Sequence, residues 1–585
     1  MSELVLTASG AVTPDAVAPP APGIAPAKTR ADREWWRDAV IYEVYPRSFA
    51  DGNGDGIGDL AGVRSRLPYL VDLGIDAIWF TPWYRSPLAD GGYDVADYRA
   101  IDPAFGTLEE AELLIAEAAE AGIRTIVDIV PNHVSVEHAW FRAALASPPG
   151  SPERARFWFR EGRGPTGDEM PTDWPSPFSG TTWTRTTEPD GTPGEWYLHL
   201  FASDQPDLNW DHPDVRREHE DILRFWFDRG VAGIRIDSAA LLVKDPALPE
   251  IPGDPEPGEH PNTDRDELHA IYRSWRAIAD AYPGTRVLVG ELWIADVERF
   301  AKYLRPDELH TAFNFDFLVR PWDAASLRES IDVTLAAHAP VGAPATWLIS
   351  NHDVTRPVTR FGQEDTSFAF VRKRRGTPAN LDLGRRRARA ASLLCAALPG
   401  SLYIYQGEEL GLEEVQDLPV EQLVDPMHFR SGGVDPGRDG CRVPLPWSGS
   451  SAPFGFSPEG AASEPWLRQP ASWAGVTVEA QRSDPDSMLN LYRSALRIRR
   501  LDALLGDGPL AWLPSDDGVL AFARGPEFVC VTNLSPAAIE LPVAGVVLLA
   551  SAQIENGRLP ADASVWIRPD PAIPAPAGSS TREAA

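Results

Sequence analysis

Eight short apolar runs, each followed by a helical pattern, constrain the fold of this chain more than any other feature. They cover residues 41–46, 77–82, 125–130, 233–237, 287–291, 311–315, 347–351 and 401–405. Strands that alternate with helices form parallel sheets, and eight such units predict a closed (β/α)8 TIM barrel rather than an open sheet. The clearest helix spans 107–121, where Thr107 and Glu110 have the spacing of a capping box and Gly122 supplies the stop.

The chain has 585 residues, which is too long for one hydrophobic core. We assign 31–133 and 212–500 to the barrel. The stretch 134–211 is too long for a connection and predicts an inserted subdomain after the third strand. Apolar runs at 519–523, 528–532 and 546–550, separated by Gly and Pro, predict a C-terminal antiparallel β domain over 501–569. The Ala- and Pro-rich ends, 1–30 and 570–585, are expected to be disordered tails, the first without the features of a secretory signal.

Net charge excludes some partners. Fifty-four basic against 85 acidic side chains give a formal net charge of -31. Such a surface repels phosphate backbones and anionic lipids, so we expect no nucleic acid and no membrane partner, whereas a neutral small molecule is compatible. No apolar run approaches the ~20 residues of a membrane span. Three widely spaced cysteines argue against a disulfide framework and predict a reducing, cytoplasmic location.

The run Gly233-Ile-Arg-Ile-Asp237 carries two charges on one face. In a strand Arg235 and Asp237 point to the same side, and Ile234 and Ile236 to the other. With the isoleucines packed against helices, the charged pair points into the barrel, where Arg235 is expected to keep Asp237 ionised with a low pKa. Either a buried structural ion pair or a catalytic carboxylate satisfies this pattern.

Three acidic residues, Asp237, Glu291 and Asp353, follow three of the predicted strands. Because active sites of such barrels lie at the C-terminal strand ends, these acids are candidate catalytic groups. Paired carboxylates cleave glycosidic bonds, one as nucleophile and one as acid. Glu291 has no basic neighbour in sequence, so its pKa is expected to stay high enough to donate a proton. Three unrelated buried carboxylates are the alternative.

The loop after the first strand has oxygen-bearing side chains at alternate positions, in Asp51, Asn53, Asp55 and Asp59, with the carbonyl of Ile57 between them. This matches the first part of a calcium loop, although residue 62 is Gly where a complete EF-hand has Glu. It predicts a structural Ca²⁺ or Mg²⁺ site, with a metal-free turn held by Asp and Asn side chains as the alternative. No organic cofactor is expected.

Four motifs resemble the signature regions of the α-amylase family of glycoside hydrolases. They occur in the family's order, as residues 128–133 (DIVPNH), 233–237 (GIRID), 290–293 (GELW) and 350–353 (SNHD). The resemblance, which covers about 32–569, implies a retaining double displacement. Asp237 would be the nucleophile, Glu291 the acid/base, and Asp353 the residue that stabilises the transition state.

The resemblance also implies a glucose-binding pocket. His133, Arg235 and His352 match residues around the bound sugar, and Asp90 and Tyr93 match an acid that closes the pocket and a tyrosine that stacks on the ring. Arg442 resembles the arginine partner of that acid, and an Asp90–Arg442 bridge would close the non-reducing end. The inserted tryptophans 158, 174, 183, 196 and 210 are expected to form a local core, with one or two left as candidates for a sugar platform.

Residues 205–209 (QPDLN) are similar to the oligo-1,6-glucosidase branch, which also holds α-1,4-glucosidases, sucrose-active enzymes and trehalose synthases. Ser238 favours α-1,4 linkages, and Leu241 stands where polymer-acting amylases have histidine. The expected function is an exo-acting α-glucosidase on maltose-like oligosaccharides, as a monomer or homodimer. The alternatives are an oligo-1,6-glucosidase or a transglycosylating, sucrose-active relative, and more remotely a non-catalytic sugar-binding or transporter-associated protein.

Overall fold

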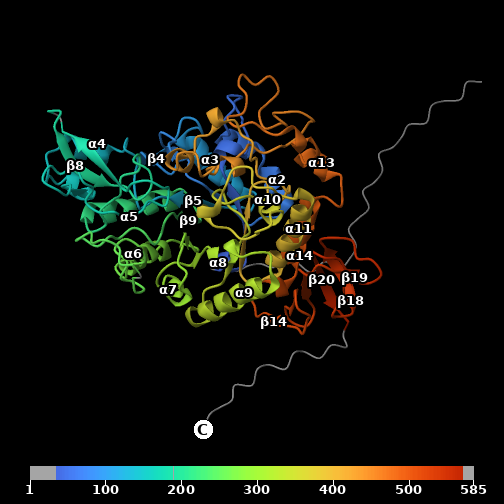
Figure 1. Ribbon diagram of the computed structural model, residues 1–585. Coiled ribbons are helices and arrows are strands. Elements are labelled where there is room, and N and C mark those ends of the chain that lie inside the picture. The colour runs from blue at the N-terminus through green and yellow to red at the C-terminus, as the bar shows by residue number, and fades with distance from the viewer. Residues whose placement is uncertain (1–33, 189, 254, 571–585) are drawn as a thin grey trace, which may run out of the picture.

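Eight parallel strands form the central sheet of the computed structural model, which describes residues 34–188, 190–253 and 255–570 (Figure 1). The expected tail at 1–30 and nearly all of the one at 570–585 lie outside these ranges. The strand order is β11-β10-β9-β5-β2-β1-β13-β12. The strands are β1 (Val40–Val44), β2 (Ala77–Phe80), β5 (Arg124–Ile129), β9 (Gly233–Ile236), β10 (Val287–Gly290), β11 (Thr311–Ala312), β12 (Thr346–Trp347) and β13 (Ser401–Tyr405).

The sheet curves until its two outer strands meet. The hydroxyl groups of Thr311 on β11 and Thr346 on β12 lie 2.6 Å apart, within hydrogen-bond distance. The fold is therefore the (β/α)8 barrel that the sequence predicts. All eight predicted strands are present, but β11 and β12 are short. The run 311–315 ends as a strand at Ala312, since Asn314 caps helix α8 (Phe315–Val319) by accepting a hydrogen bond from the Phe317 N–H.

Helices surround the barrel (Figure 1). Helix α3 (Leu108–Glu120) has the predicted capping box, in which the Thr107 hydroxyl and the Glu110 carboxylate each accept the other's backbone N–H. The other helices are α1 (Leu60–Ser65), α2 (Leu67–Leu73), α4 (Ala139–Ala146), α5 (Pro213–Asp228), α6 (Leu268–Asp280), α7 (Val297–Lys302), α9 (Ala324–His338), α10 (Pro357–Phe361), α11 (Leu381–Ala397), α12 (Pro426–Arg430), α13 (Val478–Arg482) and α14 (Met488–Leu501). No helix within the described ranges is long and apolar enough to cross a membrane.

Residues 134–211 carry an antiparallel sheet of β6 (Phe159–Arg160), β8 (Pro193–Leu198) and β7 (Trp183–Thr187), in that order. A second small pair, β3 (Tyr84–Arg85) and β4 (Asp97–Ile101), follows β2. Trp158, Trp174 and Trp183 are at most 3% exposed and share one apolar cluster, and the partly buried Trp196 packs against it. Trp210 belongs to the main core instead. The predicted local core is thus present for four of the five tryptophans.

The C-terminal sheet has the order β14 (Ala511–Trp512), β15 (Val519–Ala523), β16 (Val529–Asn533), β20 (Ala563–Pro569) and β18 (Gly545–Ala550), all antiparallel. A short pair, β17 (Ile539–Glu540) and β19 (Arg558–Leu559), lies beside it. Two side chains of β20 attach this sheet to helix α11. The Trp566 indole N–H donates to the carbonyl of Leu393, and the Ser564 hydroxyl to that of Ala390.

Candidate active site

Two of the predicted acids lie one residue beyond neighbouring strands. Backbone hydrogen bonds continue the sheet past its last residues, from Asp237 N–H to the Ile129 carbonyl and from Glu291 N–H to the Ile236 carbonyl. Ile234 and Ile236 are fully buried on the outer face of β9, so Arg235 and Asp237 point inward as the alternation predicts. The two carboxylates are therefore side by side at the C-terminal end of the barrel.

Arg235 lies beneath both acids and contacts them directly. Its Nη1 donates to Asp237 Oδ1 at 2.8 Å, and its Nη2 to Glu291 Oε2 at 2.6 Å. The same guanidinium also holds Asp128 of β5 at 2.9 Å. Glu291, which has no basic neighbour in sequence, thus shares an arginine in space. That contact is decided by the pairing of β10 with β9, which sets Val289 opposite Arg235.

One guanidinium cannot offset the burial of three carboxylates. Burial raises the pKa of Glu291 to about 7, against the opposing charge of Arg235 and with a further contribution from Asp237. Burial likewise raises the pKa of Asp237, although Arg235 and the Ser238 hydroxyl oppose the shift. The expectation of a low pKa for Asp237 was therefore wrong, because desolvation outweighs the single arginine. The high pKa expected for Glu291 is confirmed.

Ser238 joins the two acids. Its backbone N–H donates to Glu291 Oε2 and its hydroxyl to Asp237 Oδ2, both at 2.9 Å. The residue adopts a left-handed backbone conformation, with φ of +48°, which non-glycine residues seldom occupy. Functional sites commonly hold such backbone strain.

Asp353 is held differently from the other two acids. Its Oδ1 accepts from Arg438 and from Arg442, each at 3.0 Å. Burial opposes its ionisation, but the adjacent His352 and both guanidinium groups outweigh burial and hold the pKa of Asp353 well below its usual range. Of the three acids, Asp353 is consequently the one most firmly kept in the charged form.

The expected Asp90–Arg442 bridge is wrong, since Asp90 pairs with Arg438 at 2.5 Å. Arg438 and Arg442 are four residues apart across a turn of 3-10 helix (Asp439–Cys441), so both reach Asp353, but only Arg438 extends to Asp90. Arg442 instead donates from Nε to the His352 carbonyl. Spacing along the sequence cannot show which of these two arginines pairs with Asp90.

The remaining predicted sugar-binding residues come together around the same space. Tyr93 stacks on His352 with ring centroids 5.2 Å apart and donates its hydroxyl to Asp128. His352 Nδ1 is hydrogen-bonded to Glu43 of β1. Burial lowers the pKa of His133 to about 4, so that ring is neutral near pH 7. Gln205 lies between His133 and Asp90, 3.1 and 3.0 Å from them.

These groups enclose a cavity of about 340 Å³. Its lining includes all three acids and Asp90, Tyr93, His133 and His352, whereas Arg235 and Arg442 lie behind the lining. The motif reasoning missed Arg438 and the apolar residues Phe178, Phe201, Phe370 and Met427. None of the five inserted tryptophans belongs to the described lining, and Phe178 and Phe201 stand there instead. A phenylalanine in a Pro- and Gly-containing stretch, residues 177–180, is the one sequence signal that could have indicated this.

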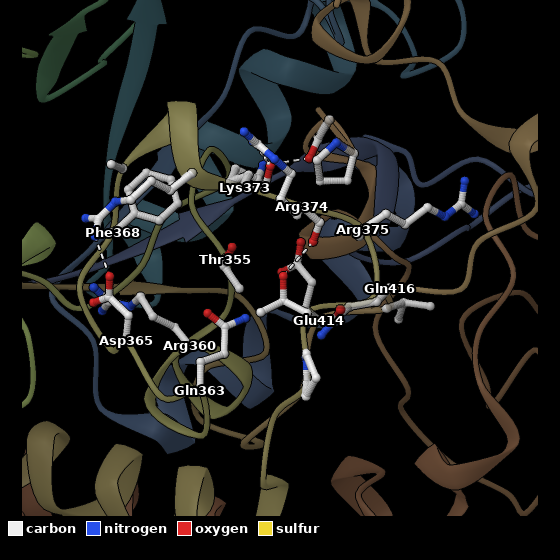
Figure 2. Close-up of a pocket in the computed structure, with 18 of the residues that line it drawn as sticks. Thr355, Arg360, Gln363, Asp365, Phe368, Lys373, Arg374, Arg375, Glu414 and Gln416 are labelled. Carbon is white, nitrogen blue, oxygen red and sulfur yellow. Dashed lines mark hydrogen bonds and ion pairs between the residues drawn. The ribbon is translucent and has the colours of Figure 1, made fainter. Parts of the chain in front are cut away.

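A second cavity, of about 710 Å³, adjoins the first and contains none of the three acids (Figure 2). Figure 2 shows Lys373, Arg374, Arg375 and Glu414 around it. Consecutive residues line the two cavities, since Phe368 and Ala369 line the larger one and the next residue, Phe370, lines the smaller. The larger volume therefore is not the site of the carboxylate chemistry.

The predicted metal loop is closed by its own backbone. Asp51 accepts from the N–H groups of residues 53, 54 and 56, and Asp59 from those of residues 52, 53 and 62. Across the described parts of the chain, no three His, Cys, Asp or Glu side chains are grouped as a metal site. The Asn53 side chain and the Ile57 carbonyl could also supply oxygen ligands, and they do not belong to these four residue types. The Ca²⁺ or Mg²⁺ site therefore stays a prediction.

A family model described as "Alpha amylase, catalytic domain" matches residues 43–508. The chain belongs to the α-amylase family. It is a glycoside hydrolase of the branch that contains α-glucosidases and oligo-1,6-glucosidases, as the resemblance of residues 205–209 implies.

Curated relatives and solved structures agree with this placement. A probable α-glucosidase of Rhizobium meliloti is 36% identical over 538 residues, covering 88% of this chain and 92% of the relative. An oligo-1,6-glucosidase of Heyndrickxia coagulans is 35% identical, covering 83% and 88%. The crystal structure of an α-glucosyl transfer enzyme matches with a TM-score of 0.80 and 34% identity, over 92% of this chain and 99% of that one. An isomaltulose synthase of Erwinia rhapontici matches with a TM-score of 0.79 and 30% identity, over 92% and 99%.

Proposed function

We propose that this glycoside hydrolase is a retaining, exo-acting α-glucosidase that releases glucose from the non-reducing end of maltose-like and short α-1,4-linked oligosaccharides. The observation that carries the proposal is the Asp90–Arg438 pair. Both residues line the cavity and are at most 4% exposed, whereas Trp293, which also lines it, is 42% exposed. A glucose unit that enters past Trp293 would end against the pair, and a longer glucan could not continue through it.

In the first step the carboxylate of Asp237 attacks the anomeric carbon. A bond forms between Asp237 oxygen and that carbon while the glycosidic C–O bond breaks, and Glu291 gives its proton to the departing oxygen. The raised pKa of Glu291, about 7, suits a group that is protonated at neutral pH and must donate. Arg235, which touches both carboxylates, favours the ionised form of Asp237.

In the second step a water molecule replaces the leaving group. Glu291, now ionised, takes a proton from water as the water oxygen bonds to the anomeric carbon and the bond to Asp237 breaks. Positive charge develops on the sugar ring in both steps. Asp353, whose pKa His352 and two arginines hold low, supplies a fixed negative charge to offset it.

The preference for α-1,4 linkages rests on Ser238, which lines the cavity beside Glu291. A small polar residue here leaves room on the leaving-group side. The first test is glucose release from maltose, isomaltose, sucrose, trehalose and soluble starch at equal enzyme concentration. We expect maltose to be preferred and starch to be nearly inert. Preference for isomaltose would overturn the linkage assignment, and rapid starch hydrolysis would overturn the exo-acting assignment.

Glucosyl transfer is the second candidate. It is favoured by the likeness to the α-glucosyl transfer enzyme and to the isomaltulose synthase. In transfer, a sugar hydroxyl would take the place of water in the second step. Product analysis with sucrose separates the two reactions, since hydrolysis yields equal glucose and fructose, whereas transfer yields new disaccharides and little glucose.

We also propose that the enzyme works in the cytoplasm. Cys395, Cys441 and Cys530 are all buried and unpaired, which suits a reducing compartment. Fractionation of cells followed by detection of the protein tests this, and recovery outside the cells would contradict it.

A further inference from the structure

The second cavity, beside the catalytic one, is lined by an excess of basic side chains. The bases in its described lining are Arg360, Arg372, Lys373, Arg374 and Arg375, and the acids are Glu364, Asp365 and Glu414. The whole chain, in contrast, carries 85 acidic side chains against 54 basic ones. Like charges repel, so gathering these bases around one cavity costs free energy unless a negative partner offsets it.

Two of the bases find that partner among the lining acids. Arg372 forms an ion pair with Asp365. Burial raises the pKa of Glu414, and the charge of Lys373 opposes that rise, so these two groups also lie within electrostatic range of each other. The positive charge of the other three bases is left to be explained.

Arg374 and Arg375 are exposed, and they donate hydrogen bonds only to backbone carbonyl groups. Within the described parts of the chain, neither guanidinium is ion-paired with a carboxylate. A guanidinium has five N–H donors, and a carbonyl group carries no net charge. Most of the donors and all of the charge of these two side chains therefore stay available to a ligand.

Arg360 is the most buried base in the lining, at 2% exposed. Its two Nη atoms donate to the carbonyls of Leu318 and Ile349, whereas Nε has no hydrogen-bond partner among the described residues. Burial lowers the pKa of Arg360 to about 10, and Glu408 offsets only part of that shift. A buried charge without a carboxylate partner is costly, and an anion in the cavity would reduce the cost.

We propose that this cavity is a second ligand site, for a small molecule that carries a phosphate group. The proposal is independent of the α-glucosidase activity, because the lining contains none of the three catalytic acids. Guanidinium groups bind phosphate oxygens through paired N–H donors. In Figure 2, Arg360 lies on the side of the cavity opposite Arg374 and Arg375, so a ligand between them would be surrounded by positive charge.

Size and overall charge restrict the ligand further. The volume of about 710 Å³ lies in the range of small-molecule sites, ~300–1,000 Å³, and leaves room for more than a phosphate group. The formal net charge of -31 repels extended polyanions, which disfavours nucleic acid and anionic membranes. Free phosphate and a sugar phosphate share the chemistry that the arginines recognise.

The test is isothermal titration calorimetry of the full chain with inorganic phosphate and with glucose 6-phosphate. Chloride holds the ionic strength constant, which removes unspecific screening effects, and glucose is the control for the sugar alone. We expect both phosphate compounds to bind at one site per chain. Equal affinities would show that the phosphate group alone is recognised, and tighter binding of glucose 6-phosphate would show that the sugar also contacts the cavity.

Variants locate the site. Arg374→Gln and Arg375→Gln each remove one exposed charge, so we expect folding to be unchanged and the affinity for phosphate to fall about tenfold, with a larger loss in the double variant. Arg386→Gln is the matched control, because Arg386 is also exposed, lies on helix α11 and is not part of the described lining. Thermal unfolding checks that all variants are folded.

The outcomes are distinct. Phosphate binding that the two lining variants weaken and Arg386→Gln preserves supports the proposal. If neither phosphate compound binds the wild type, the proposal is wrong. Binding that the double variant leaves unchanged, or that Arg386→Gln weakens to the same extent as the lining variants, overturns it as well, since the phosphate would then lie elsewhere or respond only to overall charge.

Discussion

The two sides of the catalytic cavity hold their carboxylates in opposite ways. On the β9–β10 side, one guanidinium, that of Arg235, serves Asp128, Asp237 and Glu291 together. On the opposite side, two guanidinium groups converge on Asp353. All of these groups are largely shielded from water, so burial alone does not distinguish them.

The positive charge beside each carboxylate decides which acid carries a proton. Burial raises the pKa of Glu291 to about 7 where one arginine is divided among three acids. Where His352 and two arginines adjoin one acid, the pKa of Asp353 is held well below its usual range. The comparison shows how one cavity can hold a carboxyl group with a raised pKa together with a carboxylate that stays ionised.

The largest loss of activity is expected when one acid of the β9–β10 pair, Asp237 or Glu291, is replaced by its neutral amide. We expect Asp237→Asn or Glu291→Gln to reduce kcat/KM by several orders of magnitude, because nucleophile and acid act as one unit. Glu364→Gln, an exposed acid beside the second cavity, is the control and should behave like the wild type. Steady-state kinetics on maltose measure both. Near-normal turnover of either catalytic variant would refute the assigned roles.

The next largest effect is expected at the two arginines of the opposite side. Arg438→Lys should lower kcat/KM by about 10²- to 10³-fold, because lysine cannot reproduce a fork that holds Asp90, Asp353 and Asp425 at once. Arg442→Lys should cost less, since Arg442 lies outside the cavity lining and bonds only Asp353 among the acids. Kinetics on maltose, with thermal unfolding to check folding, compare the two. A larger loss of kcat/KM for Arg442→Lys would support Arg442, the residue predicted from the sequence, as the more important arginine.

The pH dependence of kcat/KM tests whether Glu291 acts as the proton donor and whether Trp293 sets its pKa. Activity requires protonated Glu291, so kcat/KM should fall as pH rises through about 7. The Trp293 N–H stabilises the ionised carboxylate, and its loss in Trp293→Phe should raise the pKa of Glu291. The alkaline limb of the profile should then move upward by about half to one pH unit, since one unit equals ~1.4 kcal/mol. A downward shift, or none, would show that this hydrogen bond does not act on Glu291.

The linkage preference depends on the residue that bridges the pair. Ser238→Val removes the hydroxyl that donates to Asp237 and adds bulk beside Glu291. We expect the isomaltose-to-maltose ratio of kcat/KM to rise by about tenfold, with a modest loss on both substrates. Ser238→Thr keeps the hydroxyl and separates its effect from that of size. An unchanged ratio in both variants would remove Ser238 from the specificity argument.

The smallest effect concerns acids held without any arginine. Asp51 and Asp59 are surrounded by backbone N–H donors, a third way to hold a carboxylate. If the loop binds Ca²⁺ or Mg²⁺ as predicted, chelation should lower Tm by a few degrees, since a ligand at 100 times its Kd contributes ~2.7 kcal/mol. In Asp55→Asn that dependence should weaken. A Tm unaffected by chelator in both proteins would indicate a loop that its hydrogen bonds hold alone.

The sequence by itself determined the barrel and the three candidate acids at its strand ends. Eight apolar runs with polar ends admit one closed arrangement, and strand alternation places Arg235 beside Asp237 whatever surrounds them. The capping box of Thr107 and Glu110 could also be predicted from the sequence, because its two residues are close neighbours along the chain.

Only the tertiary structure decided which charges meet across the cavity. Arg438 rather than Arg442 pairs with Asp90, which is 348 residues away along the chain. The pKa of Asp237 rises rather than falls because Arg235 is shared with Asp128 and Glu291. Trp293 and Phe370, 77 residues apart in sequence, meet edge-on in the cavity lining, with ring centroids 5.6 Å apart. Electrostatic energy depends on distance and burial, and neither is a property of spacing in sequence.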